Sequence, residues 1–334
     1  MSQTKQSSTR LKFNLSQIFG TYGLLILSIL FAVIFSILLP RTFPTALTVR
    51  AILNDRATIA LLSLSALIVI AIGEFDLSLG YMVGISHILA VGLQVRQEWP
   101  WGLAVVAVLL VGALVGLVNG LLVHVAKISS FIATLGVGTT IYGLAQWYTE
   151  GHQIVGKLAP EFVALNGADV LGAIPAPTVY VAIIATAMWL VFEFLPIGRH
   201  MYALGSNARA AELVGIPRGA YTIGAFVASG LLTAFAGILL GSRFQVGQAN
   251  IGPEFLLPSF VGALLGATTV KPGRVNIWGT IIAVILLAIG ISGIQQLGGA
   301  FYIEPLFNGL TLIIAVGLAG YAGRRRMRAK AAEK

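Results

Sequence analysis

The sequence predicts an all-α, polytopic membrane protein with about ten transmembrane helices and one short helix outside the membrane. Of its 334 residues, 57% are hydrophobic and only 10% are charged, and the mean hydropathy is +0.92. A soluble domain carries about 25% charged residues. Apolar runs close to the 17 to 25 residues that a helix needs to cross hydrocarbon recur along the chain. We therefore expect one transmembrane domain, residues 19–322, between a polar tail at 1–18 and a basic tail at 323–334.

Ten apolar segments account for the predicted spans. The first exceeds a signal-peptide core and lacks a small-x-small cleavage site before Pro40, so we expect it to be retained. The eighth is short and contains Pro258, which predicts a broken or re-entrant helix that other protein must cover. The segments are Gly23–Leu39, Arg56–Gly73, Leu77–Leu93, Trp101–Val123, Phe131–Thr149, Thr178–Leu195, Ala220–Leu240, Leu257–Val270, Ile277–Ile294 and Tyr302–Tyr321.

The basic residues orient this bundle. An even number of spans puts both termini on one side, and most of the 21 Lys and Arg residues fall on that side. The positive-inside rule therefore predicts that both termini are cytoplasmic. The same topology explains the net charge of +9 without nucleic-acid binding, because the basic residues lie between apolar spans. The basic residues predicted on the other side are Arg41, Arg50, Arg56, Arg96, Lys157 and Arg243.

A short helix is predicted between the sixth and seventh spans. Ser206 or Asn207 can act as its N-cap, and Ala208–Val214 are mostly good helix formers. Gly215 suits the left-handed position after the last turn, and Pro217 stops the helix. A helix of about 10 Å cannot cross a bilayer, and it needs a surface to dock on. We interpret it as a cytoplasmic docking element. The alternative is a loop with one helical turn.

Two carboxylates interrupt the apolar pattern between the second and third spans. Glu74 and Asp76 would be costly in hydrocarbon, so they must face protein or water. Gly73 and Gly80 bracket them and permit a chain break. Asp76 or Ser78 can cap the next helix, a role that we favour over substrate contact for Asp76. Glu74 can pair with a basic residue of another helix or of a partner protein, and the sequence does not decide between them.

Three amides complete the candidate substrate pathway with Asp76. Asn119 lies within the fourth span, where its side chain must be hydrogen-bonded; bridging to another helix is favoured over contact with a polyol. Gln296 and Asn308 lie near the outer ends of the last two spans, where they suit a rim contact or an ordinary interfacial position.

Glycines recur at four-residue spacing along the fourth span, at Gly112, Gly116 and Gly120. Hydrophobicity does not drive helices together in lipid, so close packing depends on small residues. The stripe therefore predicts a tight helix contact first and a pathway lining only second.

The sequence offers no catalytic or metal site. It contains no cysteine, and its four histidines are scattered. The segment Gly151–Leu158 matches the glycine and lysine spacing of a phosphate-binding loop, but Leu158 replaces the required Ser or Thr and no strand precedes it. We therefore expect a non-enzymatic chain that binds no metal or cofactor of its own.

Three ordered motifs carry a family resemblance that covers residues from about 50 to 322. The segment Gly205–Ile216 resembles the coupling-helix loop of permease subunits in bacterial ABC importers, and the ribose/xylose/arabinose/galactose-type group is the closest. Gly73–Gly80 is similar to that group's Gly-Gly-Ile-Asp-Leu-Ser-Val-Gly signature, with Glu74 in place of the second glycine. Asn119-Gly120 followed by Ser130–Gly136 is similar to its Asn-Gly and Pro-Phe-Ile-Ala-Thr-Leu-Gly run, with Ser130 in place of the proline.

The resemblance implies the permease subunit of an ATP-driven importer in the bacterial inner membrane. A separate ABC ATPase would bind ATP and magnesium and would grip a coupling helix at about 206–215. A periplasmic sugar-binding protein would deliver a monosaccharide or related polyol, and a second permease chain, identical or homologous, would complete the pathway. The alternatives are a nucleoside, an amino acid or a signalling furanose as cargo, or an ion-driven secondary carrier. The expected ATPase contacts are Asn207, Ala208, Arg209, Ala211, Glu212, Leu213 and Gly215.

Overall fold

The computed structural model describes residues 15–170, 172–299 and 302–313, and this part of the chain is mostly helical. Its strands, each of two residues, form two small antiparallel pairs. The elements are α1 (Leu15–Leu38), α2 (Ala46–Asp55), α3 (Ala57–Ala71), α4 (Leu79–Val95), α5 (Trp101–His124), α6 (Ser130–Thr149), β1 (Ile154–Val155), α7 (Pro160–Gly167), β2 (Asp169–Val170), β3 (Ile174–Pro175), α8 (Ala176–Phe194), α9 (Pro196–Ser206), α10 (Ala208–Leu213), α11 (Arg218–Phe244), β4 (Val246–Gly247), η1 (Gly252–Phe255), α12 (Leu256–Gly266) and α13 (Ile277–Gln296).

A helix occupies each of the ten predicted apolar segments as far as the structure describes them. Within the described residues, six helical stretches are long and apolar enough to cross a membrane, and one of them joins α2 to α3. Three apolar helices are shorter: Leu79–Val95, Gly252–Gly266 and Ile303–Ile313. The remainder of the last segment, residues 1–14 and the basic tail at 323–334 lie outside the described residues.

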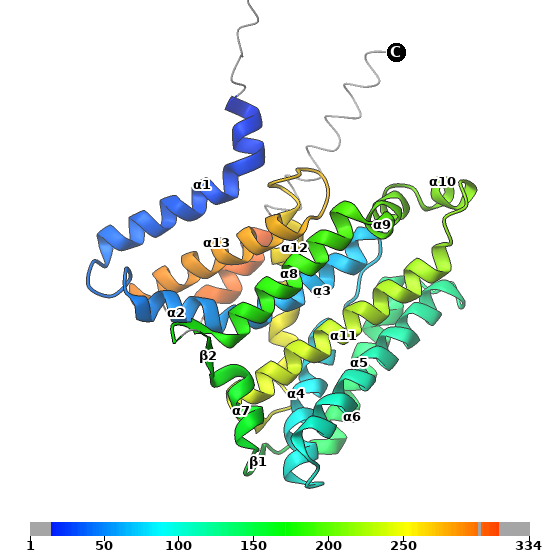
Figure 1. Cartoon of the computed structure of the whole chain (residues 1–334), viewed down its shortest axis with the longest axis horizontal. Helices are drawn as coiled ribbons and strands as arrows, with labels where there is room; N and C mark the ends of the chain where they lie inside the picture. Colours follow the sequence, from blue (N-terminus) through cyan, green and yellow to red (C-terminus); the bar gives the residue numbers. More distant parts are fainter. Residues whose placement is uncertain (1–14, 171, 300–301, 314–334) are drawn as a thin grey trace, which may run out of the picture.

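The helices α9 and α10 lie at the opposite end of the bundle from α7 and β1 (Figure 1). We call these two ends the α10 end and the α7 end. The sequence did not predict α2, α7 or α9 as separate helices. Each of the three is shorter than a span. In addition, α9 follows α8 after the single residue Leu195, so no polar linker separates α9 from α8.

The helix α11 lies at the centre of the bundle and packs against α3, α4 and α5. Its contact with α5 depends on glycine. A Cβ atom added at Gly116 would lie 2.2 Å from the carbonyl oxygen of Phe226, and one at Gly112 would lie 2.5 Å from that of Gly230. These distances confirm the tight contact predicted from the glycine stripe, because no larger residue fits between the two backbones.

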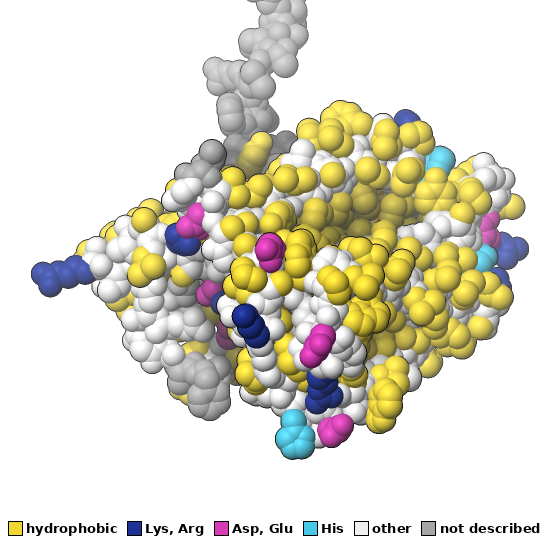
Figure 2. Space-filling view, turned by 60° about the horizontal axis from the view of Figure 1, so that its bottom comes forward, with side chains coloured by type: hydrophobic (Ala, Val, Ile, Leu, Met, Phe, Trp, Pro, Cys, Tyr) yellow, Lys and Arg dark blue, Asp and Glu magenta, His cyan; other side chains and the backbone are white. Residues whose placement is uncertain are grey.

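The opposite face of α5 is apolar and exposed. It includes Leu103, Leu110 and Leu114, each more than half exposed. Apolar side chains also cover most of the surface that Figure 2 shows, with charged side chains at only a few positions. Such a surface suits contact with lipid rather than water.

The helices have two interruptions, and the second packs against the first turns of α4. Residues 72–78 separate α3 from α4, and the segment between α11 and α12 contains β4 and the 3₁₀ turn η1. A Cβ at Gly252 would lie 2.3 Å from the carbonyl oxygen of Gly80 and 2.9 Å from the Cα of Gly84. The eighth segment itself holds one short helix, α12, with Pro258 in its first turn, and the interruption lies before it at β4 and η1. The short length is therefore confirmed, whereas the break expected within the segment is not.

Candidate functional site

The short helix α10 has the caps that the sequence predicts. The Asn207 side-chain oxygen accepts a hydrogen bond from the Ala210 N–H at 3.0 Å. Ser206 is not the cap, because its hydroxyl donates to the Ala203 carbonyl instead. At the other end, Gly215 has φ +89°, a conformation that glycine adopts at no steric cost. The helix ends at Leu213, one residue earlier than predicted.

The tip of α10 presents apolar side chains outward. Leu213 is 82% exposed and Val214 is 79% exposed, and both follow directly on the exposed Glu212. Ala211 is buried and faces the bundle. Among the predicted ATPase contacts, Asn207, Arg209, Glu212, Leu213 and Gly215 are exposed and Ala208 is half-buried.

Two contacts join the α10 region to the break at 72–78. A Cβ at Gly205, the penultimate residue of α9, would lie 2.3 Å from the carbonyl oxygen of Ala71 at the end of α3 and 3.2 Å from the Gly73 nitrogen in the break. Arg218, the first residue of α11, lies between two carboxylates: its Nη2 is 3.5 Å from Glu74 and its Nη1 is 3.6 Å from Glu212. Glu74 therefore pairs with a basic residue of its own chain, and the same arginine reaches α10.

The residues of the break that follow Glu74 take part in a buried network of hydrogen bonds. Asp76 is 3% exposed; its Oδ1 accepts the Ser78 N–H and hydroxyl, and its Oδ2 accepts the Ser229 hydroxyl of α11 at 3.2 Å. The Asn119 side chain donates to the Ser78 hydroxyl at 2.9 Å. Ser78 holds the N-cap position of α4, but its side chain makes no capping bond because Asp76 and Asn119 already engage it. Asn119 therefore bridges α5 to the break.

The network continues into α3. The Ser65 hydroxyl is 2.9 Å from the Ser229 hydroxyl and 2.8 Å from that of Thr233. The backbone of the break is also held, because the Leu77 N–H donates to the Thr134 hydroxyl of α6 at 2.9 Å. Buried polar groups in hydrocarbon need such partners. The arrangement ties α3, α5, α6 and α11 to one short segment, so displacement of the break would disturb all four helices.

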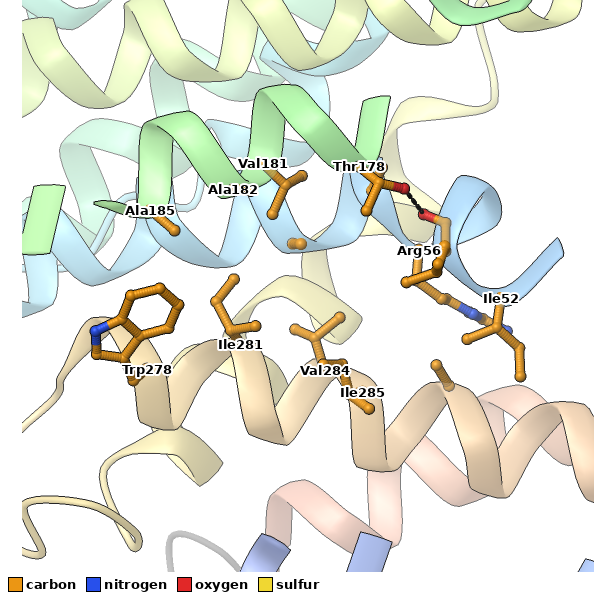
Figure 3. A pocket seen from close by; sticks show the side chains of 14 residues that line it. Ile52, Arg56, Thr178, Val181, Ala182, Ala185, Trp278, Ile281, Val284 and Ile285 are labelled. Atoms are coloured by element: carbon orange, nitrogen blue, oxygen red, sulfur yellow. Dashed lines mark hydrogen bonds between the residues drawn. The ribbon is translucent and has the colours of Figure 1, made fainter. Parts of the chain in front are cut away.

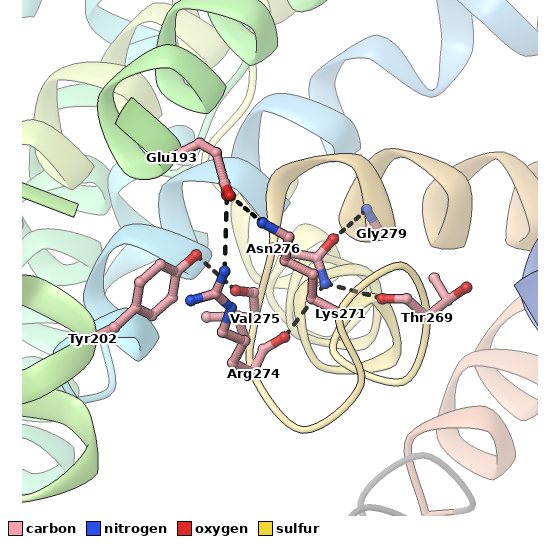
Figure 4. A network of polar contacts seen from close by, with 8 residues as sticks. All are labelled: Glu193, Tyr202, Thr269, Lys271, Arg274, Val275, Asn276 and Gly279. Atoms are coloured by element: carbon pink, nitrogen blue, oxygen red, sulfur yellow. Dashed lines mark hydrogen bonds and ion pairs between the residues drawn. The ribbon is translucent and has the colours of Figure 1, made fainter. Parts of the chain in front are cut away.

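A second polar cluster ties α9 to the loop between α12 and α13 (Figure 4). Glu193 forms ion pairs with Lys271 and Arg274, and the Arg274 guanidinium lies 4.5 Å from the ring centroid of Tyr202. Burial raises the pKa of Tyr202 to about 12, so at neutral pH its hydroxyl remains protonated and donates to the Val275 carbonyl at 2.9 Å. The α9–α10 element is thus joined both to the break at 72–78 and to the loop between α12 and α13.

Of three cavities in the described structure, two are lined mainly by apolar side chains and one by several charged residues. One of about 160 Å³ lies between α8 and α13 and is lined almost wholly by apolar side chains, with Trp278 at one end (Figure 3). A second, of about 610 Å³, lies between α8 and α11 and is equally apolar. A third, of about 770 Å³, lies at the α7 end, and charged residues including Arg56 and Glu254 line it. Only the third offers several polar contacts to a solute.

The predicted substrate-pathway residues do not form one site. Asp76 and Asn119 belong to the buried network, whereas Asn308 lines the charged cavity at the α7 end. Gln296 donates to the Thr48 hydroxyl of α2 at 3.3 Å. Sequence reasoning missed Ser229 and Thr233, because small hydroxyl residues within apolar spans are too common to stand out.

No three His, Asp or Glu side chains lie close enough to hold a metal ion in the part of the chain that the structure describes.

Comparison with known proteins agrees with this architecture. Residues 48–317 match the family model described as branched-chain amino acid transport system / permease component. The chain is 31% identical to the ribose import permease protein RbsC of Bacillus subtilis over 94% of this chain and 96% of the relative. It is 30% identical to the autoinducer 2 import system permease protein LsrD of Klebsiella pneumoniae over 79% of this chain and 80% of that protein.

A third relative, the D-allose transport system permease protein AlsC of Escherichia coli, is 26% identical over 94% of this chain and 95% of its own length. No solved structure matches the chain. The family model covers most of the chain, as does the resemblance drawn from the motifs at Gly73–Gly80 and Gly205–Ile216. The chain therefore belongs to this family of transport-system permease components.

Proposed function

We propose that the chain is the membrane-spanning subunit of an ATP-driven importer for a monosaccharide or related polyol. The relatives named above are import or transport permeases for ribose, autoinducer 2 and D-allose. Their alignments span most of this chain, and the family model covers residues 48–317, which include the buried network. A common transport role is therefore supported along most of the chain.

The geometry of α10 is the observation that most directly supports an ATP-driven mechanism. The helix is capped at both ends, it exposes Leu213 and Val214, and Arg218 links it to Glu74 in the break. An exposed apolar tip with charged neighbours suits docking onto another protein. In the proposed mechanism a separate ABC ATPase, which holds ATP and magnesium, binds this tip. Its closure moves α10 and thereby the break and the helices attached to it.

The proposed topology has ten spans with both termini in the cytoplasm of a bacterial cell, so that the α10 end is cytoplasmic and the α7 end is periplasmic. The charged cavity at the α7 end is then the face that a periplasmic sugar-binding protein would meet. A second permease chain, identical or homologous, would complete the pathway. The positions of the basic residues support this orientation through the positive-inside rule.

A signalling furanose is a second candidate cargo. It is favoured by the 30% identity to the autoinducer 2 permease, close to the value for the ribose permease. Both candidate cargoes are small, neutral and rich in hydroxyl groups, so they make the same chemical demands on a pathway.

The test is recovery of the tagged chain from detergent-solubilised native membranes, followed by mass spectrometry and an ATPase assay. The proposal predicts co-purification of an ABC ATPase whose hydrolysis is stimulated by a sugar-loaded binding protein. Recovery of this chain without an ATPase, together with uptake that depends on protons or sodium, would establish a secondary carrier instead.

A further inference from the structure

Three neutral polar side chains form a hydrogen-bonded cluster on an exposed face of the bundle. We call Tyr142 and Gln146 of α6, with Asn250 of the segment before η1, the Tyr142 cluster. The Tyr142 hydroxyl donates to the Asn250 side-chain oxygen at 2.8 Å. The Gln146 amide donates to the same oxygen at 3.0 Å and to the Tyr142 oxygen at 2.8 Å. Asn250 is exposed and the other two side chains are partly exposed, so the cluster faces out of the single chain.

Within the Tyr142 cluster, Asn250 lies deepest below the α7 end of the bundle, whereas Gln146 lies three residues before the end of α6. A Cβ at Gly84 would lie 4.0 Å from the Ala249 carbonyl oxygen and 3.2 Å from the Cα of Gly252, so Asn250 is at the level of Gly84. At a helical rise of about 1.5 Å per residue, Gly84 is about 16 Å from Val95, the last residue of α4. Measured from the end of α4, Asn250 is therefore deeper than a residue at the helix end, where exposed tyrosine is ordinary at the headgroup boundary.

Contact with lipid would be unfavourable for the cluster. The Asn250 amide nitrogen and the Gln146 amide oxygen make no hydrogen bond to any described residue, and polar groups left unpaired in hydrocarbon are costly. The exposed face of α5, by contrast, carries Leu103, Leu110 and Leu114. The α6 face therefore suits a water-filled pathway, with two N–H donors and one carbonyl acceptor available to a solute.

An aromatic wall adjoins these groups. The ring centroids of Tyr81 and Tyr142 are 6.0 Å apart, with the ring planes at 62°. Gly138 allows this approach, because a Cβ there would lie 2.5 Å from the Tyr81 ring. Sites for small molecules combine such aromatic surfaces with a few placed polar groups. No charged side chain belongs to the cluster, which favours a neutral cargo over a carboxylate or a phosphate.

We propose that the Tyr142 cluster is a cargo-binding site on the translocation pathway for a neutral polyhydroxylated solute. The Asn250 amide donates to a cargo hydroxyl, the Gln146 amide oxygen accepts from one, and the Tyr81 and Tyr142 rings contact the apolar face of a sugar ring. The proposal rests on the proposed function and assigns to it residues that bind the cargo within the membrane.

Accessibility is tested by cysteine labelling, because the chain has no cysteine of its own. Asn250→Cys is made in the assembled transporter, in proteoliposomes, and treated with a water-soluble thiol reagent. We expect labelling of this chain at position 250 and none of Leu110→Cys, whose side-chain position is 65% exposed on the lipid-facing side of α5. Failure of Asn250→Cys to react in the assembly, with reaction in the isolated chain, would mean that another subunit covers the cluster, and it would overturn the proposal.

Binding is tested by uptake of radiolabelled D-ribose and D-allose at concentrations below saturation. Asn250→Ala and Gln146→Ala should each lower the uptake rate about tenfold, the effect of one lost neutral hydrogen bond, while assembly with the ATPase is retained. Gln153→Ala, an exposed amide at the α7 end, is the matched control and should leave uptake unchanged. Normal uptake in both cluster variants would refute the proposal that the Tyr142 cluster binds the cargo. Absence of uptake in the unaltered transporter would instead refute the sugar-import function.

Discussion

Arg218 is joined to Glu74 across the α10 end of the bundle, with 3.5 Å between its Nη2 and the Glu74 Oε1. The two residues are far apart in the sequence, one at the start of α11 and the other in the break between α3 and α4. The second nitrogen of the same guanidinium lies 3.6 Å from Glu212 of α10. A displacement of α10 therefore has a direct electrostatic route to the segment that holds Asp76.

Replacing the shared arginine should uncouple ATP hydrolysis from import. In Arg218→Gln both carboxylates lose their partner, yet partly exposed ion pairs contribute at most about 1 kcal/mol to stability, so the chain should still fold and assemble. We expect the amount of solute imported per ATP hydrolysed to fall about fivefold or more, within the usual range of coupling free energies. The measurement is paired uptake and ATPase rates in proteoliposomes.

The matched control for this change is Arg199→Gln, an exposed arginine of α9 that forms no ion pair among the described residues. It should leave the ratio of uptake to hydrolysis unchanged. An unchanged ratio in Arg218→Gln would exclude the Glu74–Arg218–Glu212 contact as a route of coupling.

The apolar tip of α10 should be required for binding the ATPase and not for folding. The double change Leu213→Ser and Val214→Ser removes two side chains that are 82% and 79% exposed, so the thermal midpoint of the isolated chain should not move. Affinity for the ATPase should fall about tenfold or more, because burying a Leu or Val side chain contributes about 1.5–3 kcal/mol. Val155→Ser, 67% exposed at the α7 end, should leave affinity intact. Equal affinities in all three proteins would place the docking surface elsewhere.

The end of α10 should tolerate asparagine but not valine at Gly215. The backbone there has φ +89°, which is strained for a β-branched residue, whereas asparagine visits the left-handed region readily. Gly215→Val should therefore reduce ATP-dependent uptake several-fold, and Gly215→Asn should stay close to the unaltered rate. Similar rates for the two variants would show that the geometry after α10 does not matter for coupling.

The α5–α11 contact should depend on Gly116. A Cβ there would lie 2.2 Å from the Phe226 carbonyl oxygen, whereas nothing lies within 4 Å of the corresponding position at Gly102. Gly116→Ala should destabilise the chain by about 1–3 kcal/mol, as overpacking does, and lower its thermal midpoint in detergent. Gly102→Ala serves as the control with no loss. A midpoint unchanged by Gly116→Ala would show that the two helices separate without cost.

The helices that could be predicted are those marked in the sequence by long apolar runs or by capping residues. The boundaries of α5 and α6 and the caps of α10 follow from apolar runs and from residues with local roles such as Asn207 and Gly215. The partner of Glu74 did not follow, because an ion pair between Glu74 and Arg218 depends on how three helices pack. Tertiary packing also explains why the Ser78 side chain forms hydrogen bonds with Asp76 and Asn119 instead of capping α4.

The Tyr142 cluster could not be predicted for a related reason. Tyr142 and Gln146 are neighbours on one face of α6, a spacing that the sequence does reveal. Asn250 joins them only because Gly252 packs against Gly80 and Gly84, which brings the second interruption beside α6. A contact between backbones at glycine leaves little trace in composition or hydropathy, so the site became visible only in the fold.

We propose that this chain passes a neutral sugar across the membrane under the control of an ATPase that binds α10. The most direct test is uptake of D-ribose and D-allose by proteoliposomes that contain this chain, the co-purified ATPase and the binding protein. We expect uptake that requires ATP and all three components and that is lost when Leu213 and Val214 are replaced by serine. Uptake by this chain alone, driven by a proton or sodium gradient, would contradict it.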